Sequence, residues 1–269
     1  MSDIQAWAYS AALFCCHCAE QAHGKEALAN GTARDREGNA PSPAFADSSE
    51  ADSPQHCDSC GEFLENSLTD DGVEYVVSAI VAHETSNGKD GDSDTIKEWR
   101  EYYGANYELE NDVRRGIAAH HAECEPDDLN GPESYMEVDD CLFRHAGSQH
   151  GPEYVVLTDR EADECAQAQI AESLWAFRPE WLGEFTGLPA NGFRAIQEAE
   201  YEAANEFIRA CIDSKGDAND GLLQPDPRIP TAFERFCERS ISADGRGHFL
   251  AHYDHAENEI GDYFVYRVN

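Results

Sequence analysis

The sequence predicts an α+β fold, with a cysteine-rich N-terminal region, a helical segment and a small α+β domain at the C-terminus. Three observations support this prediction. Two cysteine pairs with CxxC spacing lie within the first 60 residues, and apolar residues recur at helical spacing in the middle of the chain. The final third begins and ends with runs of β-branched and aromatic residues. A chain of 269 residues, 41% of them hydrophobic, is long enough to bury two separate cores.

Residues 1–85 form the predicted cysteine-rich region. Within it, the stretch from about 24 to 54 is rich in Gly, Ala, Asp, Ser and Pro and lacks apolar periodicity, so we expect a flexible insert there. The run Gly72–Val81, after the second cysteine pair, predicts a short helix, although its β-branched residues leave a strand as the alternative.

Residues 94–150 are predicted to be a helical connecting segment. A capping box at Thr95 and Glu98 precedes one helix, and a second helix is expected from Glu108 to about Ala122. The acidic segment CEPDDLNGPES then ends the helical pattern. The apolar positions that predict the two helices are Ile96, Trp99 and Tyr103 in the first, and Leu109, Val113 and Ile117 in the second.

Residues 151–269 are predicted to form the α+β domain. The apolar run Glu153–Leu157 predicts a buried strand. Thr158 and Glu161 form a capping box for a helix that we expect to continue until Pro179 stops it.

The rest of this domain is predicted to be two helices and a strand. Pro230 is expected to open a short helix, and Asp262–Val268 predicts a final strand that pairs with the first strand of the domain. Between Pro179 and Pro230 we expect one long amphipathic helix, with its apolar face on Phe193, Ile196, Ala203, Phe207 and Cys211.

The charge balance is extreme, with 54 acidic and 19 basic residues and a formal net charge of -35. The phosphates of nucleic acids and anionic membrane surfaces repel such a chain, so we expect no direct nucleic-acid binding and no membrane association. The N-terminus lacks the basic region of a secretory signal, and no segment is apolar enough to span a membrane, which favours the cytoplasm. Three explanations for the acidity stay open: solvation in high salt, docking onto basic proteins, and imitation of the charge layout of DNA.

The two cysteine pairs are the strongest candidate site. Each CxxC turn places two thiolates on one ion, and two such turns complete a tetrahedral four-sulfur zinc site. A closed site of this kind is structural, because catalysis needs an open coordination position. We therefore predict a structural zinc ion held by Cys15, Cys18, Cys57 and Cys60, with Cys16, His17 and His56 as alternative ligands.

Two other groups of residues are weaker candidates. His121, Cys124, Cys141 and His145 have a spacing that suits a second zinc site, but a buried cysteine pair with surface histidines is the favoured interpretation. In the C-terminal segment, Asp244–His248 and His252–His255 combine histidine, aspartate and glycine, which suits metal binding or acid–base chemistry. A polar turn before the last strand is the favoured interpretation of that segment.

Two stretches of the chain resemble uncharacterised proteins of bacteriophages and prophages. The first is EADSPQHCDSCGEFLENSLTDDGVEYV together with the upstream cysteines, and the second runs from about Tyr154 to the end, including YVVLTDREADE, ESLWAFRPEWL and SADGRGHFLAHYDHAENEIGDYFVYRVN. This resemblance implies a viral or mobile-element origin and two modules in one polypeptide. It implies no activity.

Together these features predict a non-enzymatic, zinc-stabilised interaction protein whose acidic surface binds a basic partner. In a phage, the sharper hypothesis is a nucleic-acid mimic that inhibits a host nucleic-acid-binding or defence protein. A salt-adapted structural protein is one alternative. The other is a metal-dependent or acid–base hydrolase that uses His248, His252, Asp254 and His255.

Overall fold

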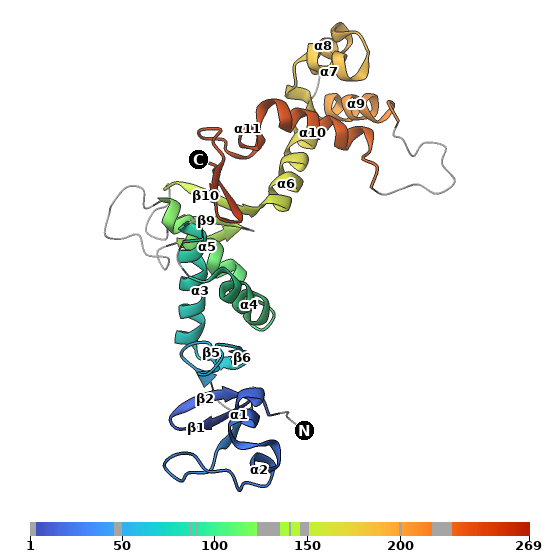
Figure 1. Ribbon diagram of the computed structural model, residues 1–269. Helices are drawn as coiled ribbons and strands as arrows, with labels where there is room; N and C mark the ends of the chain where they lie inside the picture. Colours follow the sequence, from blue (N-terminus) through green and yellow to red (C-terminus); the bar gives the residue numbers. More distant parts are fainter. Residues whose placement is uncertain are drawn as a thin grey trace. The chain divides into compact units, whose positions relative to one another are not determined.

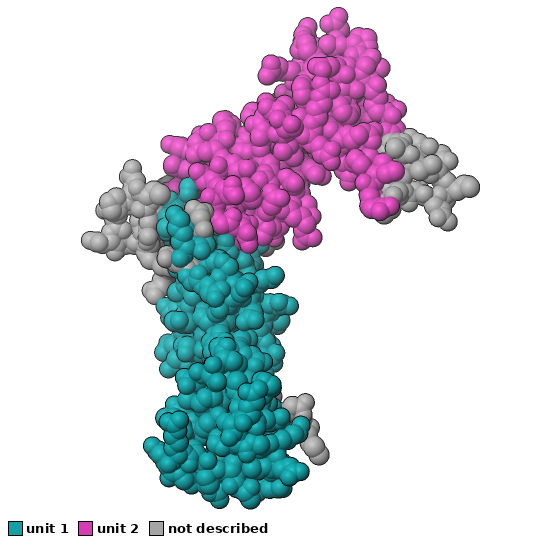
Figure 2. Space-filling model, in the orientation of Figure 1, with its two compact units in different colours: residues 1–133 teal, residues 134–269 magenta. Residues whose placement is uncertain are grey.

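The computed structural model describes residues 4–45, 50–86, 88–89, 91–122, 135–139, 141–145, 151–198, 201–216 and 228–269. The chain divides into two compact units, residues 1–133 and residues 134–269 (Figures 1 and 2). Each unit combines helices with small sheets, which confirms the predicted α+β class.

The N-terminal unit begins with a three-stranded antiparallel sheet in the order β2-β1-β3. Strand β2 leads directly into helix α1, and two further pairs of very short strands, β4 with β7 and β5 with β6, follow. The bounds of these elements are β1 (Ala6–Tyr9), β2 (Ala12–Cys15), α1 (Cys16–His23), α2 (Lys25–Ala29), β3 (Ser42–Ala44), β4 (Glu50–Ala51), β5 (Gln55–His56), β6 (Phe63–Leu64) and β7 (Ser67–Leu68).

Part of the predicted flexible insert, residues 24–54, has regular secondary structure. Residues 46–49 of this insert are not described. Helix α2 and strand β3 lie within it, and Leu28 is buried against Trp7. The carboxylate of Asp35 accepts hydrogen bonds from the backbone N–H groups of Ser10 (3.2 Å) and Asn39 (2.8 Å). These contacts belong to a segment whose composition alone predicts a loop, and that prediction of a loop was wrong for α2 and β3.

Three helices complete the N-terminal unit, and the sequence predicted a helix in each of these three segments. They are α3 (Asp70–Thr85), α4 (Ser93–Gly104) and α5 (Leu109–Ala122). The prediction of a capping box at Thr95 was wrong, because α4 begins at Ser93. Asp92 is its N-cap, and its side chain accepts a hydrogen bond from the N–H of Asp94 (3.0 Å). Asparagine and aspartate are as effective as threonine at this position, so sequence alone did not choose between the two starts.

Helices α3 and α5 pack closely because Gly116 has no side chain. A Cβ atom at this position would lie 2.6 Å from a methyl group of Val81 in α3. Buried apolar residues of all three helices form this part of the unit, so α4 and α5 belong to the N-terminal unit rather than to a separate connecting segment. They are Val76 and Ile80 of α3, Ile96, Trp99 and Tyr103 of α4, and Leu109, Val113 and Ile117 of α5.

The C-terminal unit is built on a five-stranded antiparallel sheet in the order β11-β12-β10-β9-β8. Strands β10 and β12 lie side by side, with Val156 opposite Val265, which confirms the predicted pairing of the two terminal strands. Strands β8 and β9 fall within the predicted helical segment 94–150, so that prediction was wrong for residues 135–139 and 142–145. The bounds are β8 (Tyr135–Asp139), β9 (Leu142–His145), β10 (Glu153–Thr158), β11 (Asn258–Ile260) and β12 (Tyr263–Arg267).

The helices of this unit enclose its main core. Their bounds are α6 (Asp159–Glu172), the short 3-10 helix η2 (Leu174–Ala176), α7 (Pro179–Thr186), α8 (Ala190–Gln197), α9 (Tyr201–Asp213), α10 (Ala232–Asp244) and α11 (Arg246–Leu250). The capping box of Thr158 and Glu161 is confirmed. Pro179 does not stop a helix as predicted but opens α7, a position where its missing N–H costs nothing.

The predicted long amphipathic helix is two helices, α8 and α9. In α9 the core contains Ala204, Ile208 and Ile212, whereas Ala203 and Phe207, which we expected inside, are exposed. Both sets have helical spacing, so periodicity alone predicted a buried face but placed it one residue too early.

The capping box at the start of α10 gives a testable prediction. The hydroxyl of Thr231 accepts from the N–H of Glu234 (3.1 Å), and the Glu234 carboxylate accepts from the N–H of Thr231 (2.6 Å). We expect Thr231→Ala to lower the free energy of unfolding by about 1 kcal/mol, measured by urea denaturation.

The stabilisation contributed by Glu234 should also depend on pH. Its hydrogen bonds with the backbone and side chain of Thr231 hold the pKa of Glu234 below its usual range. A lowered folded-state pKa means that the stabilisation is present above the unfolded-state value of about 4.3 and is lost as the pH falls through the folded-state value. The stability difference between the wild type and Glu234→Gln should therefore shrink in acid, and a difference that stays constant would contradict this assignment.

Candidate metal centre

The structure brings the four predicted cysteines together. The Sγ atoms of Cys15, Cys18, Cys57 and Cys60 all lie within 4.8 Å of one another, and those of Cys15 and Cys60 are 3.8 Å apart. All four thiols are free. Among the described residues, no other group of three or more Cys, His, Asp or Glu side chains gathers in this way. This cluster can bind a metal ion.

The first cysteine pair lies where strand β2 becomes helix α1. Cys15 is the last residue of the strand and the N-cap of the helix, and its Sγ accepts a hydrogen bond from the N–H of Cys18 (3.5 Å). Cys18 lies in the first turn of the helix, directly after Cys15. The tight turn of the chain at the helix start therefore places the Sγ atoms of Cys15 and Cys18 close together.

The second pair lies in the tight turn between strands β5 and β6. The N–H of Gly61 donates to the carbonyl of Cys57 (2.8 Å), and the N–H of Cys57 donates to the carbonyl of Glu62 (2.8 Å). Gly61 has a φ of 76°, in the left-handed region that glycine enters without steric cost. The glycine after the second cysteine therefore allows the turn that places Cys57 and Cys60 together.

The two turns are held against each other by backbone and apolar contacts. The N–H of Asp58 donates to the carbonyl of Leu13 in β2 (2.8 Å). Cys15 and Cys57 are buried with Ala6 and Leu64, whereas Cys60 is exposed. The centre therefore has an apolar wall on one side.

The surroundings act differently on the two buried thiols. Burial raises the pKa of Cys15 above its usual value. For Cys57, burial acts in the same direction, but hydrogen bonds from the backbone of Cys15, Cys60 and Ser59 prevail and lower the pKa to about 6. Metal ions bind the thiolate form of cysteine, so the lowered pKa makes Cys57 the more readily ionised of these two buried thiols.

None of the three alternative ligands lies in the cluster. The thiol of Cys16 donates to the carbonyl of Ile4 (3.2 Å), and a ring nitrogen of His17 lies 2.9 Å from the amide nitrogen of Gln21. His56 has a different role. Its Nε2 accepts from the indole N–H of Trp99 (3.2 Å), so its Nδ1 carries the proton and donates to the carbonyl of Gly61 (3.1 Å).

The contact between His56 and Trp99 links the second cysteine turn to helix α4. It was not predicted, because the two residues are 43 positions apart and belong to two separate local patterns, neither of which indicates contact with the other.

The second predicted metal group is described only in part. His121 is the penultimate residue of α5 and Cys141 precedes strand β9, but Cys124 lies outside the described residues, as does the side chain of His145. The prediction for these four residues stays a prediction.

The residues of the predicted hydrolase site lie partly in a cavity wall and partly outside it. His248 stacks on His255, with ring centroids 5.3 Å apart, and a carboxylate oxygen of Asp254 accepts from the N–H of Ala256 (2.9 Å). His248 and His252 line a cavity of about 710 Å³ with Asp244, whereas Asp254 and His255 are not among its lining residues. Only two of the four residues of the predicted hydrolase site, His248 and His252, therefore line this cavity.

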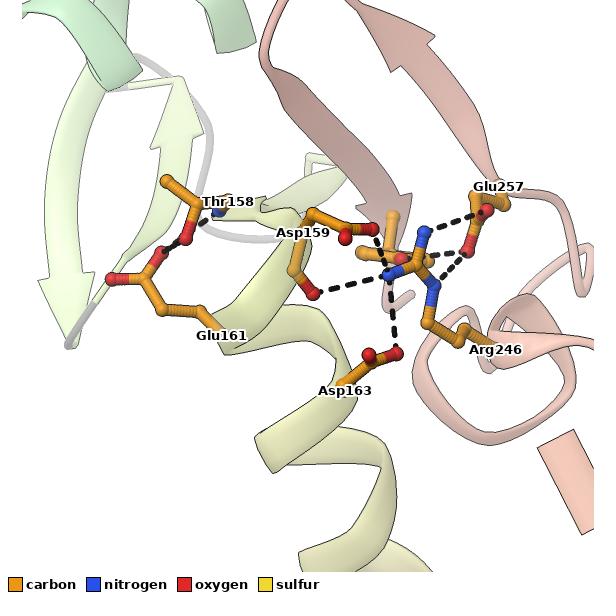
Figure 3. Close-up of polar contacts among 7 residues, drawn as sticks. Thr158, Asp159, Glu161, Asp163, Arg246 and Glu257 are labelled. Carbon is orange, nitrogen blue, oxygen red and sulfur yellow. Dashed lines mark hydrogen bonds and ion pairs between the residues drawn. The ribbon is translucent and has the colours of Figure 1, made fainter. Parts of the chain in front are cut away.

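The same segment contains a half-buried arginine that was not predicted as important. Figure 3 shows Arg246 between Asp159 and Asp163 on one side and Glu257 on the other, at distances of 2.7, 3.3 and 2.9 Å. Its guanidinium group also lies over the ring of Phe264. Burial opposes its charge, but hydrogen bonds to Glu257 and Asp159 raise the pKa of Arg246 above its usual value. These contacts join α6 to the segment that leads into β11.

No protein-family model, curated protein or solved structure matches this chain. Within the part of the chain that the structure describes, every helix is too short or too polar to cross a lipid bilayer.

Proposed function

We propose that this chain is a non-enzymatic interaction protein, in which a structural zinc ion stabilises the N-terminal unit and the acidic surface binds a basic partner protein. The sharper form of this proposal, in line with the resemblance to phage proteins, is a nucleic-acid mimic that occupies the binding site of a host nucleic-acid-binding or defence protein.

Zinc is the ion that the cysteine cluster suits best. Four thiolates are a common ligand set of structural zinc sites, in which the Zn–S distance is about 2.3 Å. In a tetrahedron of that size the sulfurs are about 3.8 Å apart. The observed separation of the Cys15 and Cys60 sulfurs, 3.8 Å, fits this value. With four protein ligands no coordination position stays open for a substrate, so the ion has a structural role.

The single observation that supports an interaction function is the exposed, uncompensated acidity. Even if every one of the 19 basic residues paired with its own carboxylate, 35 carboxylates would lack a partner. Within the described residues, Glu84 is the only buried acidic side chain. The other acidic side chains of the described residues are therefore partly or fully open to solvent, where their charge attracts and orients a basic protein.

The hydrolase alternative has less support, because its four residues are divided between a cavity wall and a turn. The salt-adapted alternative makes a different prediction about stability. Such a protein needs high salt to remain folded, whereas an interaction protein remains folded in low-salt buffer.

The test is capture of a partner with the tagged full chain from bacterial lysate, washed with increasing salt and challenged with duplex DNA. We expect a nucleic-acid-binding protein to be retained at low salt, and to be released by salt because exposed charges are screened. If it is released by DNA as well, the mimic is supported. Thermal unfolding with and without added salt serves as the control. Retention of no protein at any salt would contradict the proposal.

A further inference from the structure

An exposed pair of aromatic residues lies beside the N-terminal end of α9. Trp175 is 45% exposed and Tyr201 is 59% exposed, and their ring centroids are 6.4 Å apart. Aromatic side chains bury a large apolar area when they pack, so two neighbouring rings open to solvent form an unusual surface. Tryptophan and tyrosine are also the residues that most often contribute strongly to protein–protein binding.

The pair is held in a defined position. The N–H of Trp175 donates to the side-chain carbonyl of Asn205 in α9 (2.7 Å), and the amide group of Asn205 donates in turn to the carbonyl of Glu172. Asn205 thus fixes the end of α6 and the start of η2 against α9. The two exposed rings therefore lie on a surface whose backbone is held in place by hydrogen bonds.

Three exposed acidic residues stand close to the aromatic pair along the chain. The carboxylate of Glu202 accepts a hydrogen bond from the hydroxyl of Tyr201 (3.3 Å), and Glu206 follows Glu202 by one helical turn. Glu172 is the last residue of α6, and its backbone carbonyl is the group that accepts the hydrogen bond from Asn205. Within the described part of the chain none of the three makes an ion pair. By contrast, the neighbouring Glu180 and Glu184 are paired with Arg194 and Arg239.

Aromatic faces and carboxylates together attract cationic side chains, because the ring face carries partial negative charge. The same unit already uses this contact internally. Arg209 lies 3.5 Å from the ring centroid of Phe233, and Arg267 lies 3.7 Å from that of Tyr253. No cationic side chain of the described residues lies over Trp175 or Tyr201.

We propose that Trp175, Tyr201, Glu172, Glu202 and Glu206 form the docking surface for an arginine-bearing segment of the basic partner. This inference rests on the proposed function and specifies where the partner binds. The planar guanidinium group stacks on an aromatic ring and donates to a carboxylate at the same time, so arginine is favoured over lysine. The surplus of carboxylates disfavours nucleic acid and anionic lipid as occupants.

The test measures binding of an arginine-rich peptide and a lysine-rich peptide of equal length and charge to the full chain by calorimetry. We expect tighter binding of the arginine peptide, and a loss of about tenfold in affinity in Trp175→Ala and in Tyr201→Ala. Tyr201→Phe keeps the ring and should retain most of the affinity. Tyr253→Ala is the matched control, because Tyr253 is equally exposed but already covered by Arg267. Circular dichroism of each variant checks its fold.

Two outcomes separate this inference from the proposed function. Salt-sensitive binding that is unchanged in Trp175→Ala and Tyr201→Ala would overturn the docking surface and leave the acidic interaction protein intact. Absence of binding by the wild type at low salt would overturn both.

Discussion

Replacement of Cys57 by serine is expected to abolish zinc binding and to unfold the part of the N-terminal unit that contains β1 to β7. The physical reason is the small size of its core. The two buried clusters there, one around Cys15 and Cys57 and one around Trp7, each contain only four buried residues. Cores of this size rarely fold alone, whereas a structural zinc site contributes about 10–16 kcal/mol of binding free energy.

The measurement combines metal analysis of the purified chain with hydrogen exchange. The wild type should contain one zinc ion per chain, and Cys57→Ser none, with fast exchange of the β1 and β2 amides. The β10 and β12 amides should stay protected, because the C-terminal unit has its own core. A chelator should reproduce the effect in the wild type, and added zinc should reverse it.

Cys16→Ser is the matched control for this experiment. Cys16 is adjacent to Cys15, but its thiol contacts the carbonyl of Ile4 rather than the cluster. It should retain zinc and protection. A zinc-free wild type, or a Cys57→Ser variant with unchanged protection, would contradict the proposed structural role of the metal.

The features that sequence could predict are those fixed by local chemistry. A CxxC pair encodes its own turn, so the cluster of Cys15, Cys18, Cys57 and Cys60 could be predicted although 38 residues separate the two pairs. The capping box at Thr158 also acts over three residues, and it is present in the structure.

The features that sequence missed depend on contacts between distant residues. Helix α9 has apolar residues on two faces, and only packing against the rest of the unit determines that Ile208 is buried and Phe207 exposed. Strands β8 and β9 are short, and each becomes a strand by pairing in the sheet rather than through its own composition. The ordering of residues 25–29 likewise depends on Leu28 meeting Trp7.

Replacement of Arg246 by alanine is expected to lower the free energy of unfolding of the C-terminal unit by about 2–3 kcal/mol. Its side chain is only 11% exposed, and it pairs with three carboxylates from two separate segments of the chain. Loss of a buried charge partner costs about 3–5 kcal/mol when the remaining charge stays buried. The expected value is smaller here, because Asp159 and Asp163 are largely exposed and regain water.

Two further variants make the prediction specific to this geometry. Arg246→Lys keeps the charge but cannot bridge carboxylates on both sides while lying over Phe264, so its loss should be intermediate. Arg160→Ala removes an 83% exposed arginine from the same helix region, paired with Glu164 at 3.8 Å, and should cost less than about 0.5 kcal/mol. Hydrogen exchange of the β10 and β12 amides in urea measures this unit separately from the other. Equal losses in Arg246→Ala and Arg160→Ala would show that Arg246 does not hold α6 to the segment before β11.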